Sequence, residues 1–429
     1  MIGETPLRPV SLLNVRVPAA LSDGLPLHGH DPETGLALTN FAIDERGHIA
    51  PASHAPAIDM EGRIALPCFI DSHVHLDKAF IVQRTGLPKS SLLDAVRLSI
   101  GDAVNRTQDD LRERMKKGLK LAYANGTSAM RTHLDTPEMP AESPAWAVFN
   151  ELRTLWKGRL ALQAVALMAL ERVENGDFAE RCRQIAEFEG VLGAFVPPGE
   201  ATAARLDTLF DYAARFGLDV DFHVDESLDA MANGLELIAE SVLRTGFAGH
   251  VVAGHCCSLA TRSEAEAEAL IAKVAEAGIH IISLPHSNLY LQDRTANRTP
   301  RLRGLTLVHE LRAGGVPVHF ASDNVQDPFF PFGEFDMLEV IRSSVRLAHL
   351  DTDIGSWMPE LYRNAAAATR FDAHGRIVTG QSADFIVFDA TDWYGLLSHP
   401  HSNRMVFQNG VALSPGKPDL RELFAMEFS

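Results

Sequence analysis

The chain is short of positive charge. Its 429 residues include 39 lysines and arginines against 56 aspartates and glutamates, which gives a formal net charge of −17 at neutral pH. A protein that binds nucleic acid or an anionic membrane needs a basic field on its surface, and this composition supplies none. We therefore expect neither nucleic acid nor a membrane as a partner, and we interpret the acidic excess as a well-solvated surface.

Cysteines and long apolar runs are also scarce. The longest uncharged apolar stretch, Leu160 to Leu170, is too short to span a bilayer, and the first residues contain no apolar signal-peptide core. The few cysteines exclude a disulfide framework and fit a reducing compartment, so we expect a cytoplasmic protein. They show no C-x-x-C spacing and lie at Cys68, Cys182, Cys256 and Cys257.

The middle of the chain contains a regular alternation of short apolar strands and amphipathic helices. Eight strand-helix units follow one another, and helices such as the one that Gly126 ends place apolar residues on a three-to-four spacing. A doubly wound sheet is the competing architecture, but no Gly-x-Gly-x-x-Gly follows any strand. The pattern predicts an α/β fold, a (β/α)8 TIM barrel over residues 66–370. The expected strands are Ile64 to Ile70, SAMRTHLD, LALQAVAL, VLGAFV, LDVDFHVD, HVVAGH, IHIISLP and VPVHFASD.

The two ends of the chain have a different character. Residues 1–65 and 371–429 alternate short apolar runs with turn clusters. In both, helical periodicity extends over no more than a turn or two. We expect the two ends to pair into one small β-sandwich domain beside the barrel. Two independent tails are the alternative.

Histidines and acidic residues gather where the predicted strands end, which is where a barrel of this kind places its chemistry. Side chains two residues apart on an extended chain point the same way, so His73 and His75 can both bind one metal ion from the same side. A lone histidine at a strand end is more often structural, but a set from four strands is hard to obtain by accident. No lysine on strand three or four could bridge a second metal through a carbamate, so we expect one ion. The set comprises His73 and His75 on strand one, His223 on strand five, His255 on strand six and Asp323 on strand eight.

These segments resemble those of bacterial cytosine deaminases, in the mononuclear branch of the amidohydrolase superfamily. The motifs that carry the resemblance are FIDSHVHLDK, RTHLD, HVDES, GHCCS, LYLQDR and SDNVQDPFFPFG, and they cover most of the barrel in order. The resemblance implies a divalent ion, zinc or iron(II), with His255 close to the activated water and not bound to the ion. The metal ligands that it implies are His73, His75, His223 and Asp323.

The chemistry of such a site agrees with this implication. A divalent ion held by three neutral imidazoles and one carboxylate lowers the pKa of a bound water to about 7. Asp323 and His255 can accept its proton and hold the nucleophile against an sp2 carbon that carries an amine. Glu226, three residues after His223, can protonate a ring nitrogen and then the leaving ammonia. The structural alternative for Glu226 is a carboxylate that interacts with a helix dipole.

Three residues are candidates for substrate binding. The resembled family has a glutamine on strand three that contacts the amide edge of the ring, and Gln163 matches it; a glutamine bonded to backbone is the alternative. Asn324 stands where cytosine deaminase has a second aspartate, which leaves cytosine itself in doubt. Phe329 can wall a flat ring or pack within its own loop. No role is assigned to Cys68, Lys78, His133 or His286.

We therefore predict a metal-dependent hydrolase of carbon–nitrogen bonds in nucleobase metabolism. It would remove the exocyclic amine of a cytosine-like aminopyrimidine or aminotriazine and release ammonia. Two other enzymes would need the same activated water: a cyclic amide hydrolase, and a triazine amidohydrolase that releases an N-alkylamine. A non-catalytic barrel scaffold is the alternative of another class, although such a protein would be expected to lack some of the ligands. By analogy with barrel hydrolases of this type, we expect the chain to form a homo-oligomer.

Overall fold

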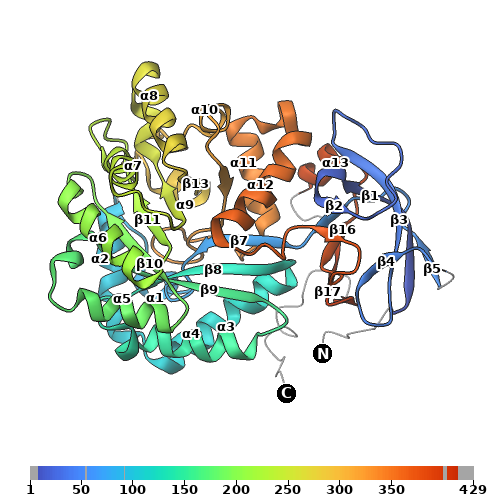
Figure 1. The fold of residues 1–429 in the computed structure, drawn as a ribbon, viewed down its shortest axis with the longest axis horizontal. Coiled ribbons are helices and arrows are strands. Elements are labelled where there is room, and N and C mark those ends of the chain that lie inside the picture. Colours follow the sequence, from blue (N-terminus) through green and yellow to red (C-terminus); the bar gives the residue numbers. More distant parts are fainter. Residues whose placement is uncertain (1–7, 54–55, 91, 400–402, 414–429) are drawn as a thin grey trace.

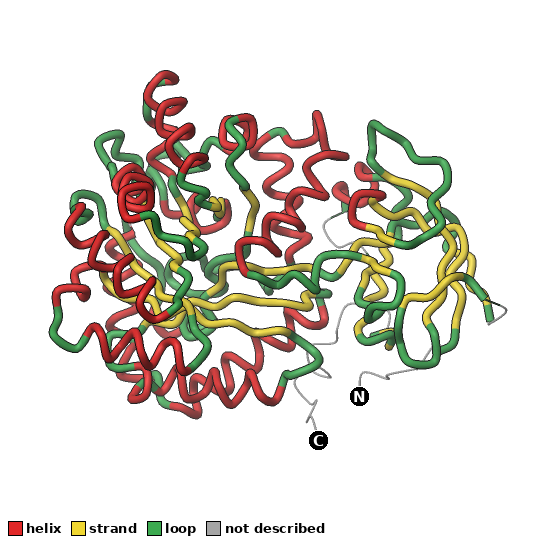
Figure 2. The backbone as a smooth tube through the Cα atoms, viewed as in Figure 1, coloured by secondary structure: helices red, strands yellow, loops and turns green. Residues whose placement is uncertain are grey.

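Eight parallel strands in the middle of the chain form one sheet with helices on its outside (Figures 1 and 2). The computed structural model describes residues 8–53, 56–90, 92–399 and 403–413. Each strand pairs with the next one along the sequence, in the order β7 to β14. These strands are β7 (Phe69–Val74), β8 (Thr127–Asp135), β9 (Ala161–Ala169), β10 (Val191–Val196), β11 (Val220–Val224), β12 (Val251–His255), β13 (His280–Ser283) and β14 (Val318–Phe320).

A backbone contact joins the first of these strands to the segment after the last. The amide nitrogen of Asp323 donates to the carbonyl oxygen of His73 at 2.8 Å, and Val74 forms a parallel bridge with Asp323. The sheet therefore curls nearly onto itself, and the predicted (β/α)8 TIM barrel is confirmed.

The outer helices alternate with the strands as predicted, with additions in three connections. The regular helices are α3 (Gln108–Ala124), α4 (Pro144–Leu155), α5 (Phe178–Glu187), α6 (Ala203–Phe216), α7 (Gly234–Thr245), α8 (Glu264–Glu276), α10 (Val308–Ala313) and α11 (Met337–Ala348). The additions are α1 (Val82–Thr85) and α2 (Leu92–Gly101) after β7, α9 (Pro285–Leu291) after β13, and α12 (Ile354–Thr369) after α11. The sequence pattern did not predict α12, which packs against β7 and β14.

The apolar run from Ile64 to Ile70 was predicted as one strand, and the structure corrects this. Its first part, β6 (Ala65–Pro67), pairs with β16 (Phe385–Phe388) outside the barrel. The amide of Cys68 still bonds to that outer sheet, through the Asp384 carbonyl at 3.1 Å, whereas the amide of Phe69 bonds to the Gly126 carbonyl at 2.9 Å and begins the barrel. The run thus passes from one sheet to the other, and His73 lies inside the barrel strand instead of just beyond it.

The two ends of the chain share a small sandwich of two four-stranded sheets, seen on the right of Figure 1. One sheet comes from the first part of the chain: β1 (Val10–Pro18), β3 (Leu36–Ile43), β4 (Ile49–Pro51) and β5 (Ala57–Asp59). The other joins β6 and β16 to β17 (Arg404–Gln408) and β18 (Val411–Ala412). Phe41 and Phe385 meet edge to face between the sheets, with ring centroids 5.3 Å apart. The placement of domain boundaries at residues 65/66 and 370/371 stays a prediction.

Shorter elements and one glycine complete the contact between sandwich and barrel. β2 (Ser22–Asp23) pairs with β15 (Ile377–Val378), and α13 (Trp393–Ser398) follows β16. Gly126 ends the turn between α3 and β8 with φ of 93°, and a Cβ atom there would collide with the Ile386 side chain. Only glycine therefore suits both the backbone conformation and the close approach of the two bodies.

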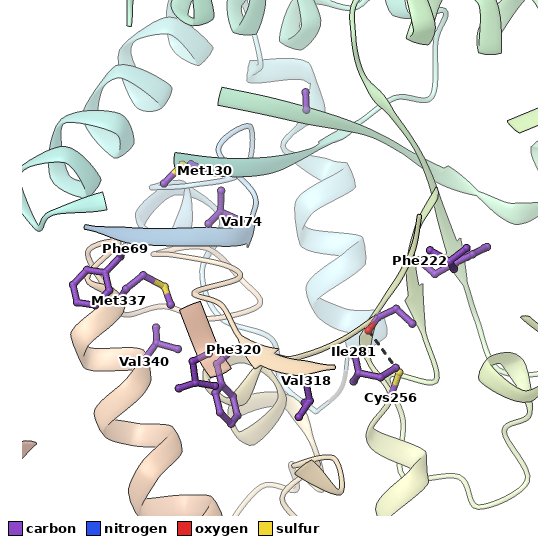
Figure 3. Packing of buried hydrophobic residues seen from close by; sticks show 14 of the residues in the cluster. Phe69, Val74, Met130, Phe222, Cys256, Ile281, Val318, Phe320, Met337 and Val340 are labelled. Carbon is purple, nitrogen blue, oxygen red and sulfur yellow. Dashed lines mark hydrogen bonds between the residues drawn. The ribbon is translucent and has the colours of Figure 1, made fainter. Parts of the chain in front are cut away.

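Apolar side chains fill the space between the strands and the outer helices. Figure 3 shows Phe69 of β7, Phe320 of β14 and Met337 of α11, which surround one small hollow. All four tryptophans of the chain are buried as well. Burial of this kind contributes about 25 cal/mol per Å² of apolar surface and makes the barrel a rigid frame for the strand ends. Within the described ranges, no helix has both the length and the apolar character needed to cross a membrane.

Candidate active site

Three histidines converge at one end of the barrel. The Nε2 atom of His223 lies 3.1 Å from Nε2 of His73 and 3.2 Å from Nε2 of His75. The Oδ1 atom of Asp323 lies 3.2 Å from Nε2 of His75 and 3.7 Å from Nε2 of His73. The structure therefore brings together all four residues that were predicted as metal ligands.

The donor set fits a divalent metal ion. Burial lowers the pKa of His73 and of His223 well below the ordinary value, and neighbouring histidines lower it further. The imidazoles are therefore neutral, which is the form that binds metal. Oδ1 of Asp323 accepts no hydrogen bond from the described residues. Three neutral nitrogens and one carboxylate oxygen, all buried, form a donor set of the kind that holds a divalent ion in catalytic sites with an open position.

The backbone places these groups by leaving the strand conformation just where each strand ends. His255, the last residue of β12, has φ of 71°, and Asp323, which follows β14, has φ of 61°. Positive φ is costly for residues other than glycine, and such residues concentrate at functional sites. The turn directs both side chains toward the barrel mouth, where they meet the histidines of β7 and β11.

Glu226 and His255 lie side by side next to the cluster. The Oε1 atom of Glu226 is 3.6 Å from Nδ1 of His255, and both side chains are buried. Burial raises the pKa of Glu226 well above the ordinary value, and the charge of Asp323 raises it further. Both effects favour the protonated form that a general acid needs.

Helix α9 supplies two partners that the sequence reading missed. The hydroxyl of Ser287 donates to Oδ2 of Asp323, and the amide nitrogen of Asn288 contacts both Glu226 and His255. The only sequence signal was polar character in LPHSNLYLQDR directly after the seventh strand. His286 points elsewhere: it bonds to Ser343 and stacks on Phe330.

A cavity of about 310 Å³ opens beside the cluster and has two unlike halves. One half faces the reacting groups and is lined by His75, His223, Glu226, His255 and Asn324. The other half extends to the ends of β9 and β10 and to helix α2, and its mostly apolar lining also includes Ser99, Glu171 and Arg172. Its apolar walls are Leu92, Val96, Leu167, Met168, Phe195 and Phe329.

Lys78 and Asp135 form a charged edge of the cavity. The Lys78 ammonium is 4% exposed and pairs with Asp135, which also accepts a hydrogen bond from Arg106 at 3.1 Å. Asp77 completes the group by accepting from the Asp135 backbone amide at 2.9 Å. Two cations and two carboxylates thus balance in charge, and Lys78, which had no assigned role, lines the same cavity as His75 and His223.

Asn324 and Phe329 lie in the cavity wall, and the contact with substrate that was predicted for them stays a prediction. The Asn324 amide nitrogen donates to Asp327 at 2.6 Å, and Asp327 also accepts from the backbone amides of Phe329 and Phe330. Because its nitrogen is used in this way, Asn324 presents its carbonyl oxygen to the cavity.

Gln163 does not lie in the cavity, and this prediction is corrected by the structure. It occupies the third position of β9, whereas the cavity is lined by Leu167, Met168 and Ala169 at the far end of that strand. Its Oε1 atom accepts a hydrogen bond from Arg131 at 2.7 Å. The glutamine lies in the barrel interior and does not contact the cavity in which a ring would bind.

Arg131 belongs to a buried charged network beneath the histidines. Its guanidinium donates to Asp221 at 2.9 Å, and Oδ1 of Asp221 lies 3.1 Å from Nε2 of His133. The His133 ring lies against the His73 ring, with centroids 3.9 Å apart. This network supports the cluster from below, and it gives His133 a place that the sequence left open.

The chain is similar to known hydrolases over most of its length. A model of the amidohydrolase family matches residues 148–408. A pterin deaminase of Rhizobium rhizogenes (strain K84) is 44% identical over 381 residues, which are 87% of each chain. The N-isopropylammelide isopropyl amidohydrolase of Pseudomonas sp. (strain ADP) is 22% identical over 368 residues, 82% of this chain and 86% of that protein. The crystal structure of 5-methylcytosine deaminase from Klebsiella pneumoniae, liganded with 5-fluorocytosine, has a TM-score of 0.80 and 25% identity, over 95% of this chain and 98% of the other.

Proposed function

The chain belongs to the amidohydrolase family, and from that premise we propose that it hydrolyses the exocyclic amine of a pterin-like ring. Membership of this family makes the chain a hydrolase of carbon–nitrogen bonds, of the deaminase type. A pterin is a 2-amino-4-oxopyrimidine, the ring of isocytosine, fused to a pyrazine. The reacting group is therefore still the predicted cyclic amidine, but the preferred substrate has two fused rings instead of one.

The observation that carries this proposal is the shape of the cavity. The part beside Glu226 and His255 has polar walls, and the part toward α2 and the ends of β9 and β10 is mostly apolar, with Ser99, Glu171 and Arg172 also in its lining. A single pyrimidine ring at the histidine cluster would leave the apolar half unfilled, whereas a fused second ring would bury its faces there. Met168 and Phe195 offer a thioether and an aromatic ring to a flat heterocycle.

The residues of the cluster can serve this reaction when a divalent ion is bound. His73, His75, His223 and Asp323 would hold the ion, and it would supply a water of pKa about 7. The protonated Glu226 can place its proton on the ring nitrogen next to the carbon under attack, which lets that nitrogen take up electron density. The carboxylate left behind can then take up the proton that the attacking water gives to Asp323 and pass it to the departing amine, so one residue serves both transfers.

Two residues are suited to recognise the ring edges. Lys78 can donate to a ring oxo group, because its ammonium has three donor hydrogens and Asp135 needs only one. Asn324 presents an oxygen that can accept from a ring N–H. An oxo group together with a ring N–H is the lactam edge that a 2-amino-4-oxopyrimidine displays.

The closest alternative within enzymes is the release of an alkylamine. The Pseudomonas relative at 22% identity carries that activity in its name, and water activation is common to both reactions. A cyclic amide hydrolase stays a second alternative from the same chemistry. A non-catalytic scaffold is not favoured, because the predicted ligand residues are present and converge.

The experiment is a product assay on zinc-loaded and iron(II)-loaded protein. Pterin, isocytosine, cytosine, an N-alkylaminotriazine and a cyclic amide are offered separately, and ammonia, alkylamine and new carboxylate are measured. We expect ammonia from pterin, with a higher kcat/KM than from either single-ring pyrimidine. Alkylamine or carboxylate as the main product, or cytosine as the best substrate, would reject the proposal.

A matched variant ties the activity to the site. Glu226→Gln keeps the size and polarity of the side chain but cannot transfer a proton. We expect kcat to fall by about 10²- to 10⁴-fold with unchanged metal content.

A further inference from the structure

Asn288 occupies a position that no sequence motif assigned to the reaction. It lies on α9 with 1% of its surface exposed, between the two groups that flank the histidine cluster. Its Nδ2 atom is 3.0 Å from Nδ1 of His255 and 3.3 Å from Oε1 of Glu226. An amide nitrogen carries two hydrogens, so it can donate to both groups at once. The structure places the amide nitrogen, and not the amide oxygen, toward both groups.

This contact decides which nitrogen of His255 carries the proton. A neutral imidazole has one N–H and one bare nitrogen, and a nitrogen that accepts a hydrogen bond must be the bare one. Nδ1 of His255 accepts from Asn288, so the proton lies on Nε2. That atom is buried and has no hydrogen-bond partner among the described residues, while the ring borders the cavity.

We propose that Asn288 is a positioning residue that makes His255 a hydrogen-bond donor at Nε2, and that keeps His255 from binding the metal ion or acting as the base. The inference rests on the proposed function and deepens it. It also revises the expectation that His255 and Asp323 share the role of proton acceptor. Asp323 alone keeps that role, and His255 stabilises the oxygen or nitrogen that gains charge at the reacting carbon.

The geometry of the cluster agrees with this division of roles. Ligand atoms of His73, His75 and His223 lie together within 4.8 Å, and His255 does not belong to that group although its ring centroid is 5.0 Å from that of His223. A nitrogen that bears a proton has no lone pair for a metal. His255 can therefore sit against the cluster and still leave the open position to water.

The same contact orders the carboxyl group of Glu226. Asn288 donates to Oε1, which leaves Oε2 as the oxygen that carries the transferable proton. Gln292, one turn further along the chain, donates from its side-chain amide to the backbone oxygen of Glu226 at 3.3 Å. Together the two amides fix both the position of Glu226 and the direction in which its proton points.

A direct test measures the protonated nitrogen of His255 by nuclear magnetic resonance. The zinc-loaded protein is labelled with ¹⁵N-histidine, and the His255 signals are identified by their loss in His255→Gln. We expect a bare Nδ1 and a protonated Nε2 in the wild type. Asn288→Asp keeps the shape but offers an acceptor, so the protonated nitrogen should become Nδ1. A wild-type Nε2 without a proton would overturn the proposal.

A kinetic test separates positioning from general structural damage. Asn288→Ala should lower kcat for ammonia release by about 100-fold with little change in KM and in zinc content, because the reacting groups stay but lose their alignment. The matched control is Asn364→Ala, which removes an asparagine whose amide donates to the Val318 carbonyl, at 2.9 Å, outside the site. The control should keep the wild-type kcat.

The outcomes distinguish this inference from the proposed function. If the wild type releases no amine from any probe, the proposed function fails, and the resonance experiment still decides the tautomer of His255. If the wild type is active and Asn288→Ala keeps a kcat close to that of the control, the positioning role is wrong.

Discussion

The amide of Asp323 donates to the carbonyl oxygen of His73 at 2.8 Å. This hydrogen bond, with the Val74–Asp323 bridge beside it, joins the first strand to the segment after the last, and the two residues that form it are both predicted metal ligands. The fold and the site therefore depend on one another: the ends of the barrel sheet must meet before the ligand set is complete.

Removal of the carboxylate ligand should abolish both metal binding and turnover. Asp323→Ala takes away the one anionic ligand, and a metal ion supplies several kcal/mol of transition-state stabilisation, so kcat should fall at least about 10³-fold. Metal content by elemental analysis should fall in parallel. A chelated wild type should lose activity and regain it with zinc, iron(II) or manganese(II), and full activity in metal-free protein would contradict the site.

Gln163 and Asn324 should differ in their effect on substrate binding. Gln163→Leu alters a residue that bonds to Arg131 inside the barrel, so KM should stay within about twofold of the wild type. Asn324→Leu removes an oxygen from the cavity wall and should raise KM by about tenfold, the equivalent of one hydrogen bond. Steady-state kinetics with the same pterin substrate compare the two. Equal effects would restore Gln163 as a binding residue.

The apolar half of the cavity should select for ring size. Val96→Trp adds bulk from α2, away from the metal ligands, and should raise KM for a pterin by about tenfold or more because the second ring loses its space. Isocytosine should be affected little, since one ring needs only the polar half. A variant that loses both substrates equally would indicate damage to the site itself.

The ion pair of Arg131 and Asp221 should be costly to break from one side. Both side chains are almost fully buried, at 1% and 0% exposure. Arg131→Met would leave Asp221 as an uncompensated buried charge and should lower the free energy of unfolding by about 3–5 kcal/mol. Replacing both residues, in Arg131→Met with Asp221→Leu, should recover most of that loss in urea denaturation. A single variant as stable as the wild type would show that the pair contributes nothing.

Asp110 should make stability depend on pH in the acid range. Burial opposes its ionisation, but hydrogen bonds from Arg84 and Arg114 outweigh this and lower its pKa to about 2. A lowered pKa stabilises the folded state above the unfolded value near 4, and the contribution disappears as the pH falls toward 2. After a discount for solvent screening, Asp110→Asn should cost about 1 kcal/mol at neutral pH.

The measurement is urea denaturation of the wild type and Asp110→Asn between about pH 7 and pH 3, and the difference in unfolding free energy should shrink toward the acid end. The effect bears on the site because Arg114 also donates to the carbonyls of Asp77 and Ala79, which flank Lys78. A difference that stays constant with pH would mean that the aspartate titrates at its ordinary value.

Period and order along the chain were enough to predict the barrel and the gathering of the histidines and Asp323 at one end of it, whereas the choice of ligands among them came from the resemblance to cytosine deaminases and stays a prediction. Alternating apolar strands and amphipathic helices define the fold, and the parallel strands of a barrel bring their carboxyl ends together whatever their separation in sequence. His73 and Asp323 are far apart in the chain, yet their places at strand ends made their approach predictable. The position of Glu226, three residues after His223, made its approach to the same cluster predictable in the same way.

Side-chain partners depend on register and could not be predicted in the same way. Gln163 was assigned to the cavity because it lies on the correct strand, but a strand rises about 3.3 Å per residue, so four positions separate the floor from the mouth by about 13 Å. Asn288 was missed because an isolated asparagine has no pattern. Helix α12 was missed for another reason: its alanine-rich end and Pro359 resemble a connection more than an amphipathic helix.

The buried network of Arg131, Gln163 and Asp221 has one more consequence. In the described part of the chain these side chains lie in the barrel beneath His73, and the cavity lies on the other side of the histidines, toward α2 and the ends of the strands. With the proposed function, substrate and water would enter, and ammonia and the deaminated ring would leave, on this same side of the barrel. A deaminated ring that dissociates slowly would therefore delay the binding of the next substrate, even when the carbon–nitrogen bond is cleaved rapidly.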